Sequence, residues 1–219
     1  MQCPLVIFDC DGVLIDSEAI ACRADAACLA ELGITITVDE IMERYLGISA
    51  AAMCFDIEQR YGLALPQDFV ATLHKRVAAV FDTELSSITG VEPLLQTLRY
   101  PRCVASSSAP ERLRHSLSVT GLLGYFEPHI FSATQVARGK PAPDLFLFAA
   151  DAMKVPPASC IVVEDSVPGV QAAVAAGMQA IGFTGGEHCR PGHAERLRAT
   201  GAADIAADMP SLSALLSSA

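Results

Sequence analysis

Basic residues are scarce in this sequence of 219 residues, which contains 15 lysines and arginines but 25 aspartates and glutamates. The formal net charge of −10 would repel the phosphates of a nucleic acid and the headgroups of an anionic membrane. The charge therefore argues against nucleic-acid and membrane partners. It suits a protein that concentrates a divalent cation.

Cysteine pairs and long apolar runs are also missing. The eight cysteines include no Cys-x-x-Cys pair, and several stand in apolar runs, where a thiol packs as a small hydrophobic group. No apolar run approaches the roughly 18 residues that cross a bilayer, and Asp9 follows the amino terminus too closely for a signal peptide. We therefore expect reduced thiols in a cytoplasmic protein.

Apolar residues are plentiful: they make up 52 % of the sequence, which predicts a globular fold. The length of 219 residues allows one large or two small domains. Short apolar runs predict strands over residues 5–8, 102–105, 130–132, 160–163 and 179–183. Helical patterns lie between them, over residues 91–98, 110–120, 144–153 and 167–175. Strands that alternate with helices are typical of a doubly wound parallel α/β sheet.

Residues 16–87 differ, because their pattern is helical throughout. A first helix is expected from Ser17 to Leu32, and Gly33 ends it. Further helices, with breaks at 47–49, 62 and 66, extend to about residue 81, and we find no convincing strand there. The sequence thus predicts two domains: a Rossmann-like core of residues 1–15 and 88–219, and an all-helical cap of residues 16–87 inserted after the first strand.

Two acidic residues follow the first predicted strand. Leu5 to Phe8 is apolar throughout and indicates a strand buried on both faces, and Asp9 and Asp11 stand at its carboxyl end. In open α/β sheets that edge is where ligands bind. Two carboxylates spaced in this way tend to project to the same side, where each raises the pKa of the other. An arrangement that is unfavourable for stability indicates a function.

Three further polar stretches stand at or just beyond the carboxyl ends of predicted strands. The carboxyl ends of parallel strands share one edge of the sheet, so we expect all four stretches to meet there. The four stretches are Asp9-Cys10-Asp11-Gly12, Ser106-Ser107-Ser108, Lys140-Pro141 and Glu164-Asp165. Phosphoryl transfer requires charge placed against the transferring oxygens more than it requires covalent chemistry. Lys140 and the backbone amides after Ser106 would supply the positive charge.

The carboxylates of this set suit a magnesium ion, which takes oxygen ligands and keeps several waters. Asp9, the backbone carbonyl of Asp11 and Asp165 would suffice as ligands, with Glu164 as a further ligand or as a partner of one. The ion would keep Asp9 anionic, so that Asp9 could attack a phosphate and form an aspartyl phosphate. Asp11, with a pKa raised by its neighbours, would act first as acid to the leaving group and then as base to water.

Each stretch also has a simpler interpretation. An Asp-x-Asp-Gly sequence after a strand is often a turn or a helix cap, and three serines before Pro110 and Glu111 are often a capping cluster in which Ser108 caps the helix. Lys140 could be a surface lysine, and Glu164-Asp165-Ser166 could cap the helix that follows. Because all four stretches lie at one edge of the predicted sheet, a single functional site explains them more simply than four separate structural roles do.

The motifs closely resemble those of the haloacid-dehalogenase-like hydrolase superfamily. The resemblance covers nearly the whole chain, and it rests on four motifs in order: Phe8-Asp9-Cys10-Asp11-Gly12-Val13-Leu14-Ile15-Asp16-Ser17-Glu18, Val104-Ala105-Ser106-Ser107-Ser108, Gly139-Lys140-Pro141-Ala142-Pro143-Asp144, and Val163-Glu164-Asp165-Ser166-Val167-Pro168-Gly169. The chain is similar to the branch with a small helical cap, which includes β-phosphoglucomutases and sugar-phosphate phosphatases.

This resemblance implies roles for individual residues and a Mg²⁺ cofactor. Asp9 would be the nucleophile, Asp11 the acid and base, Ser106 and Lys140 the phosphate ligands, and Asp165 a magnesium ligand. It also implies that the peptide bond before Pro141 is cis.

Differences within the superfamily favour a phosphatase that acts on a small phosphorylated metabolite. Dehalogenases lack the second aspartate that is present here as Asp11. The mutases carry a histidine at the position of Ala21 and a lysine near Ala109, and this chain has neither. The wider pattern, including residues 81–85 and 88–90, is similar to that of bacterial 6-phosphogluconate phosphatase-like proteins. This similarity implies a sugar or sugar-acid phosphate, such as 6-phosphogluconate, as substrate.

Two alternatives stay open. A sugar-phosphate mutase of the β-phosphoglucomutase type is the first. The second is a phospho-accepting receiver module, which also gathers acids, a hydroxyl and a lysine around Mg²⁺. Receivers are roughly half as long, have no inserted cap and place the accepting aspartate after a later strand.

Substrate contacts are expected from Ser107 and Ser108 and from the cap. In the family the loop that matches 47–49, with Gly47, points at the substrate, which makes Arg44 and Arg23 candidates for binding an anionic sugar. Arg44 could instead pair with Glu40, and Glu18 could face the cleft or favour the start of its helix. The linkers near Asp16 and Gly90 are the expected hinge. The sequence leaves open whether the protein is a monomer or a weak dimer.

One further motif, His188-Cys189-Arg190-Pro191-Gly192-His193, has the residue types of a zinc site. Two histidines and one thiol without a fourth ligand nearby in the sequence favour a plain loop at the edge of the sheet instead.

Overall fold

The computed structural model describes residues 4–45, 48 and 50–217. The chain forms two compact units. The first contains the residues up to Asp16 and those from Ser86 onward, and the second contains Ser17–Leu85. Among the described residues, no helix is both long enough and apolar enough to cross a membrane.

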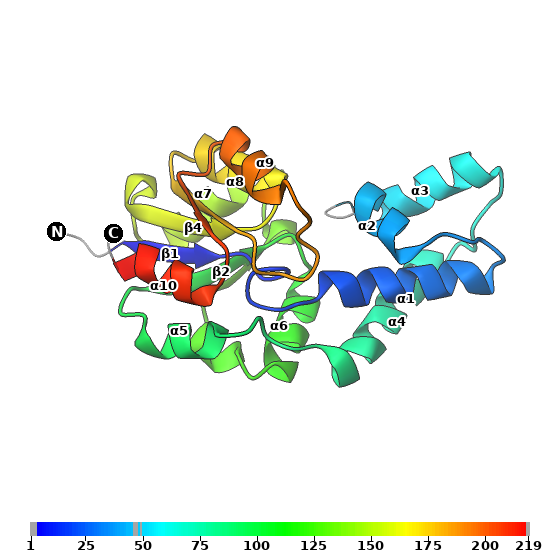
Figure 1. Ribbon diagram of the computed structural model, residues 1–219, viewed down its shortest axis with the longest axis horizontal. Coiled ribbons are helices and arrows are strands. Elements are labelled where there is room, and N and C mark those ends of the chain that lie inside the picture. Colours follow the sequence, from blue (N-terminus) through cyan, green and yellow to red (C-terminus); the bar gives the residue numbers. More distant parts are fainter. Residues whose placement is uncertain (1–3, 46–47, 49, 218–219) are drawn as a thin grey trace. The chain divides into compact units, whose positions relative to one another are not determined.

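A six-stranded parallel sheet forms the centre of the first unit, with the strand order β3-β2-β1-β4-β5-β6. The strands are β1 (Leu5–Phe8), β2 (Arg102–Ser106), β3 (Ile130–Ser132), β4 (Cys160–Glu164), β5 (Gln179–Phe183) and β6 (Asp204–Ala206). The predicted α/β class with a parallel sheet is confirmed, and the five predicted strands are present. The edge strand β6 was not predicted. β1 lies between β2 and β4, where the order of the strands reverses (Figure 1).

Helices cover both faces of this sheet. Figure 1 shows α7 (Asp144–Ala152), α8 (Val167–Ala175) and α9 (His193–Thr200) above the strands, with α5 (Val91–Thr97), α6 (Pro110–Val119) and α10 (Met209–Ser217) below them. Three short 3₁₀ turns, Leu123–Tyr125, Ala133–Gln135 and Pro157–Ser159, lie in the connections. This two-layer cover explains why the central strands are apolar on both faces.

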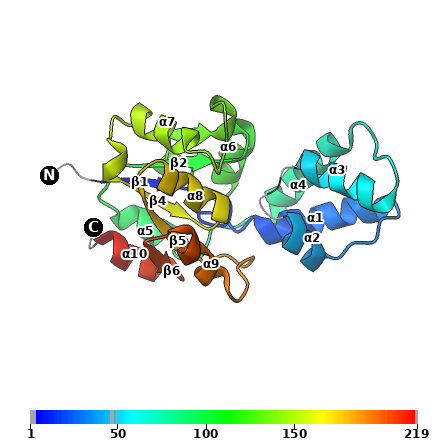
Figure 2. The same cartoon turned by 90° about the horizontal axis from the view of Figure 1, so that it is seen from above.

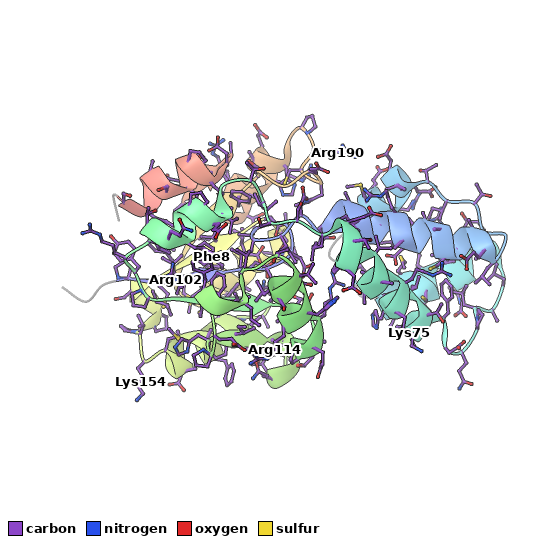
Figure 3. All side chains as sticks on the ribbon, turned by 90° about the horizontal axis from the view of Figure 1, so that it is seen from below. Phe8, Lys75, Arg102, Arg114, Lys154 and Arg190 are labelled. Carbon is purple, nitrogen blue, oxygen red and sulfur yellow. The ribbon has the colours of Figure 1, made fainter. Side chains whose placement is uncertain are left out.

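The first strand is buried on both faces. All four residues of β1 have no exposed surface, and Leu5 and Ile7 belong to the same apolar cluster as Phe146 of α7. Val6 and Phe8 alternate with them and point to the other face, where the ring of Phe8 meets Phe126 edge to face at 6.0 Å. Figure 3 shows Phe8 enclosed, in contrast to exposed side chains such as Lys154. Burial of each such side chain contributes about 1.5–3 kcal/mol to the stability of the fold. The position of β1, and of the acidic residues that follow it, is therefore well defined.

The second unit consists of the helices α1 (Glu18–Glu31), α2 (Val38–Tyr45), α3 (Ala50–Tyr61) and α4 (Phe69–Glu84), which Figure 2 shows grouped together. No strand occurs in the described part of this unit, as predicted. Helix α1 packs on α2 and α4. The core includes Leu29, Ile41, Ile57 and Leu73, each at most 2 % exposed. Apolar side chains therefore hold this unit together without a sheet.

Seven cysteines of the described chain are free, and six of them are buried. This agrees with the expectation that thiols here pack as small hydrophobic groups.

We expect the apolar core of the second unit to dominate its stability. Leu73→Ala should lower the free energy of unfolding by about 2–5 kcal/mol, because Leu73 is 1 % exposed and its loss leaves a cavity. Urea denaturation followed by circular dichroism measures this change. Phe55→Ala is the matched control, since Phe55 is 64 % exposed in the same unit and should change the value by less than about 0.5 kcal/mol. Equal losses in the two variants would contradict the assignment of this core.

Candidate active site

Polar side chains converge at the carboxyl ends of the three central strands. Asp9 follows β1, Ser106 ends β2, and Glu164 ends β4 with Asp165 next to it. β1 pairs with both β2 and β4, so these positions are neighbours across the sheet. All four residues are buried, with at most 7 % of their surface exposed. The structure thus brings together the first, second and fourth of the predicted stretches.

Lys140 joins this group from the loop before α7. Its Nζ donates to Asp9 Oδ1 at 2.7 Å, to Glu164 Oε1 at 2.6 Å and to the backbone oxygen of Ala105 at 3.2 Å, which engages all three donors of an ammonium group. The side chain is 5 % exposed, so the simpler interpretation as a surface lysine is wrong. Burial opposes the charged form, but the two carboxylates outweigh it and raise the pKa of Lys140. The predicted cis bond between Lys140 and Pro141 is confirmed.

Asp9 lies in an environment with an excess of negative charge. Burial is the main reason that the pKa of Asp9 lies well above its usual range. The Lys140 ammonium opposes this shift, whereas the three neighbouring carboxylates add to it. A bound cation would relieve this repulsion and keep Asp9 ionised.

Glu164 is held in place from two sides. Its Oε2 accepts hydrogen bonds from the backbone N and from Oγ of Ser166, both at 2.8 Å, while Oε1 accepts from Lys140. The Ser166 side chain also accepts a bond from the N–H of Gly169 and so caps α8. A side chain at Gly169 would collide with Glu164, because its Cβ would lie 1.9 Å from Glu164 Cδ. The glycine thus makes room for the carboxylate.

Asp11 faces a different set of partners. Ser108 Oγ donates to its Oδ2 at 2.7 Å, and Arg112 Nη2 donates to its Oδ1 at 3.0 Å. The prediction that Ser108 caps α6 is therefore wrong: Ala109 is the residue that precedes the helix, and the hydroxyl is directed to Asp11 instead. Sequence reasoning missed Arg112. The available signal was a basic residue in the first turn of the helix that begins directly after the serine stretch.

The serine stretch folds into a turn. Ser106 Oγ accepts a hydrogen bond from the N–H of Ser108 at 3.1 Å, and Ser132 Oγ donates to the backbone oxygen of Ser108 at 2.7 Å. Ser107, between them, is exposed. The loop therefore places one buried hydroxyl and one exposed hydroxyl beside the carboxyl end of β1.

The loop of residues 184–192 reaches this site as well. His188 Nε2 lies 2.8 Å from Asp165 Oδ2, and the histidine side chain is 1 % exposed. Burial disfavours the charged imidazole, but the hydrogen bonds and charges of Asp165 and Cys189 outweigh it and raise the pKa of His188 to about 11. Gly12, with φ of +77°, leaves the necessary space, because a Cβ there would lie 2.1 Å from Asp165 Oδ2. The expected plain loop at the sheet edge is thus in contact with a predicted metal ligand.

The carboxylates of Asp9, Glu164 and Asp165 form a group that could hold a metal ion. Each offers one oxygen, and these oxygens all lie within 4.8 Å of one another. Three buried oxygen donors and an excess of negative charge fit a hard cation such as Mg²⁺. The side chain of Asp11 is held by Ser108 and Arg112, which leaves its backbone carbonyl for the predicted role as a ligand.

The predicted substrate residues of the cap lie in the second unit. Arg23 pairs with Glu84 at 2.5 Å, and Arg44 pairs with Glu40 at 3.2 Å, which is the alternative considered for it. Glu18 is partly buried in the first turn of α1. Gly47 lies outside the described residues.

Comparisons with known proteins place the chain in a family of hydrolases. Residues 3–177 match the haloacid dehalogenase-like hydrolase family. The 6-phosphogluconate phosphatase of Escherichia coli (strain K12) is 36 % identical over 187 residues, which are 85 % of each chain.

Two solved structures are similar over nearly the full length. A haloacid dehalogenase-like protein of unknown function from Agrobacterium tumefaciens str. C58 has a TM-score of 0.88 and 39 % identity, with 99 % of each chain covered. A hydrolase of the same family from Deinococcus radiodurans R1, determined with bound phosphate and sodium, has a TM-score of 0.82 and 33 % identity, with 99 % of this chain and 96 % of that chain covered.

We expect the contact between His188 and Asp165 to stabilise the fold in a pH-dependent manner. The pKa of His188 in the folded chain, about 11, lies above its ordinary value of 6.5, so the stabilisation is complete below pH 6.5 and is lost as the pH rises towards 11. With EDTA present, the loss of unfolding free energy caused by His188→Gln should therefore shrink by at least about 1 kcal/mol between mildly acidic and alkaline pH.

Urea denaturation at a series of pH values measures this difference. His129→Gln, at an exposed histidine, is the control and should leave the unfolding free energy close to that of the wild type at every pH. A loss in His188→Gln that stays constant over the whole range would contradict the assignment.

Proposed function

The chain belongs to the haloacid dehalogenase-like hydrolase family, and from this premise we propose that it is a magnesium-dependent phosphatase of a small phosphorylated metabolite. The substrate class that we propose is a sugar or sugar-acid phosphate, with 6-phosphogluconate as the first candidate. One observation carries the proposal: Asp9 is held by Lys140 beside Glu164 and Asp165, with Asp11 two residues further on.

Asp9 is the proposed nucleophile. Lys140 donates to its Oδ1 and so orients the carboxylate, which supports an attack on phosphorus by Asp9. The bond between phosphorus and the ester oxygen breaks as the new bond forms, and the product is a phosphoaspartate. Lys140 and the loop that starts at Ser106 place positive charge and N–H groups where the phosphate oxygens gather charge.

Asp11 is the proposed acid and base. Its carboxyl group would give a proton to the departing ester oxygen and then take one from the water that hydrolyses the phosphoaspartate. Ser108 and Arg112 hold the two oxygens of this carboxyl, so they fix its direction. The Arg112 side chain is 36 % exposed, so its positive charge is also available to an anionic leaving group.

Asp9, Asp165 and the backbone carbonyl of Asp11 would hold the Mg²⁺ ion. When bound, the ion neutralises negative charge on Asp9 and on the phosphate. Glu164 is tied to Lys140 and Ser166, which favours a role as a partner of the ligands over a role as a ligand itself.

We propose that the substrate is contacted by Arg23, Arg44, Glu18 and Gly47 of the cap and by Ser107 of the core. An anionic sugar acid would suit the two arginines. The free thiols support the further proposal that the enzyme works in a reducing compartment such as the cytoplasm.

The two alternatives are separated by chemistry. A mutase would need groups that replace the missing histidine at Ala21, on α1, and the missing lysine at Ala109, before α6. The family match favours a hydrolase over a receiver module.

The decisive experiment is a screen of sugar and sugar-acid phosphates, with and without Mg²⁺, followed by phosphorus NMR. We expect free inorganic phosphate from at least one substrate and none after addition of EDTA. A sugar-phosphate isomer without free phosphate would establish a mutase, and a stable phosphoprotein without turnover would establish a receiver.

We expect Asp9→Asn to lower the rate of phosphate release by at least about 10³-fold, because the amide cannot attack the phosphate. The measurement uses the best substrate of the screen at saturating Mg²⁺. Asp151→Asn is the matched control, since Asp151 is exposed near the end of α7, and it should keep the wild-type rate. Undiminished hydrolysis by Asp9→Asn would refute the mechanism.

Asp165→Asn should raise the Mg²⁺ concentration needed for half-maximal activity by about 10–100-fold, because one anionic oxygen donor is lost. Calorimetric titration of the protein with Mg²⁺ should show the same loss of affinity without substrate. If neither value changes, Asp165 is not a ligand.

A further inference from the structure

We propose that His188, Cys189 and His193 form a second cation site, which takes a divalent ion that prefers sulfur and nitrogen ligands, such as Zn²⁺. The site goes beyond the proposed phosphatase function and is tested by metal binding alone.

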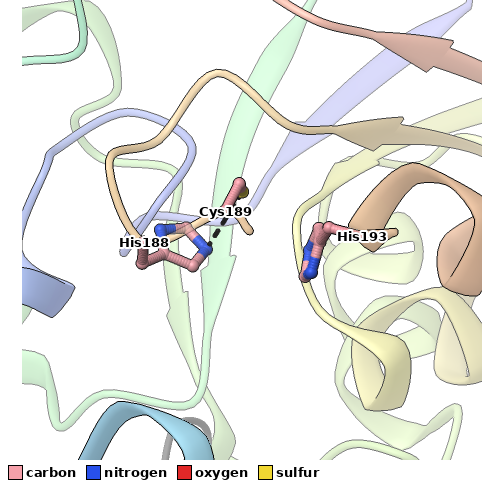
Figure 4. A group of neighbouring side chains, drawn as sticks. All are labelled: His188, Cys189 and His193. Atoms are coloured by element: carbon pink, nitrogen blue, oxygen red, sulfur yellow. Dashed lines mark hydrogen bonds between the residues drawn. The ribbon is translucent and has the colours of Figure 1, made fainter. Parts of the chain in front are cut away.

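The three side chains converge although they belong to a loop and a helix. One ligand atom from each lies within 4.8 Å of the others (Figure 4). Cys189 Sγ lies 3.4 Å from His188 Nε2, and His193 begins helix α9 four residues after Cys189. Adjacent histidine and cysteine residues followed by a histidine thus become one cluster in the folded chain.

The chemistry of these donors differs from that of the magnesium site. Asp9, Glu164 and Asp165 offer oxygen atoms only, whereas this cluster offers two imidazole nitrogens and one sulfur. Late first-row ions bind nitrogen and sulfur much better than Mg²⁺ does, and four-coordinate zinc sites commonly contain such a set. The two neighbouring groups should therefore select different ions.

A fourth ligand is close to the cluster. The sequence argument against zinc was that it offered none, but the fold brings in Asp165 from the end of β4, with Oδ2 at 2.8 Å from His188 Nε2. Water could also complete the site, because Cys189 is only partly buried. The tertiary structure thus removes the main objection to this motif.

The loop is built around the histidines. His188 and His193 are 4 % and 9 % exposed. A side chain at Gly186 would collide with His188, since its Cβ would lie 2.7 Å from the ring, and Gly12 leaves room on the same ring. His188 Nδ1 is buried and has no hydrogen-bond partner in the described chain. Such enclosure is costly for an imidazole that serves only as a loop residue.

Hydrogen bonds connect His193 to residues outside the cluster. His193 Nε2 lies 2.5 Å from the backbone oxygen of Asp165, and Arg196 Nη2 donates to His193 Nδ1 at 2.9 Å. Ion binding would replace the bond between His188 and Cys189 and one of the bonds of His193. The thiol of Cys189 and the imidazole of His188 would release their protons, as ligands do when a metal ion takes the place of shared protons.

The test is a titration of metal-free protein with Co²⁺, which reports a thiolate ligand through a sulfur-to-cobalt absorption band in the near ultraviolet. Saturating Mg²⁺ is present to occupy the oxygen site. We expect one Co²⁺ per chain with this band, and its loss when Zn²⁺ is added. The readout requires no substrate, so its failure leaves the proposed phosphatase function untouched.

Two variants assign the ligands. Cys189→Ala should abolish the band, and His193→Gln should weaken Co²⁺ binding by at least about tenfold. Cys54→Ala and His129→Gln are the matched controls: Cys54 lies in the second unit, His129 is exposed, and both variants should bind as the wild type does. Thermal denaturation shows which variants are folded.

A wild-type protein without the band, or a band that persists in Cys189→Ala, would overturn the proposal. If Cys189→Ala does not fold, the His193→Gln variant alone tests the proposal. An unchanged affinity of that variant for Co²⁺ would then overturn the proposal.

Discussion

A buried ammonium between two buried carboxylates is the interaction on which the rest of this molecule depends. Lys140 Nζ is bonded to Asp9 after β1, to Glu164 at the end of β4 and to a backbone oxygen of β2, so one side chain connects three neighbouring strands at their carboxyl ends. Loss of such a partner leaves a buried charge unpaired and costs about 3–5 kcal/mol. Lys140 therefore connects the three strands and, in the mechanism that we propose, also positions the nucleophile Asp9.

Packing around these charges explains the glycines of the motifs. Gly12 and Gly169 stand where a Cβ would lie about 2 Å from the carboxylates of Asp165 and Glu164. Each glycine lets the backbone approach a charged group closely, and both carboxylates are largely shielded from water. In a site of this kind the position of each charge is set before a substrate arrives, which is the condition for electrostatic catalysis.

The two carboxylates of the first motif, those of Asp9 and Asp11, have different hydrogen-bond partners. Asp9 is bonded to Lys140 within the acidic group, whereas Asp11 is bonded to Ser108 and Arg112 at its side. Asp165 stands between two donor sets: the oxygen atoms of Asp9 and Glu164, and the nitrogen and sulfur atoms of His188, Cys189 and His193. In the functions that we propose, one short sheet edge thus serves a nucleophile, an acid and two kinds of cation.

Sequence patterns predicted five of the six strands, the helical block and the edge at which the acids gather, because apolar runs such as Leu5–Phe8 must be buried whatever their neighbours are. They missed the short edge strand β6, which is only partly buried. The sequence also predicted the cis bond at Pro141, through the resemblance to a family. Three contacts became known only from the folded chain: Ser108 bonds to Asp11, Arg112 joins it across 101 residues, and His188 contacts Asp165. A hydrogen bond depends on a separation of about 3 Å between groups remote in the chain, and local patterns carry no information about such distances.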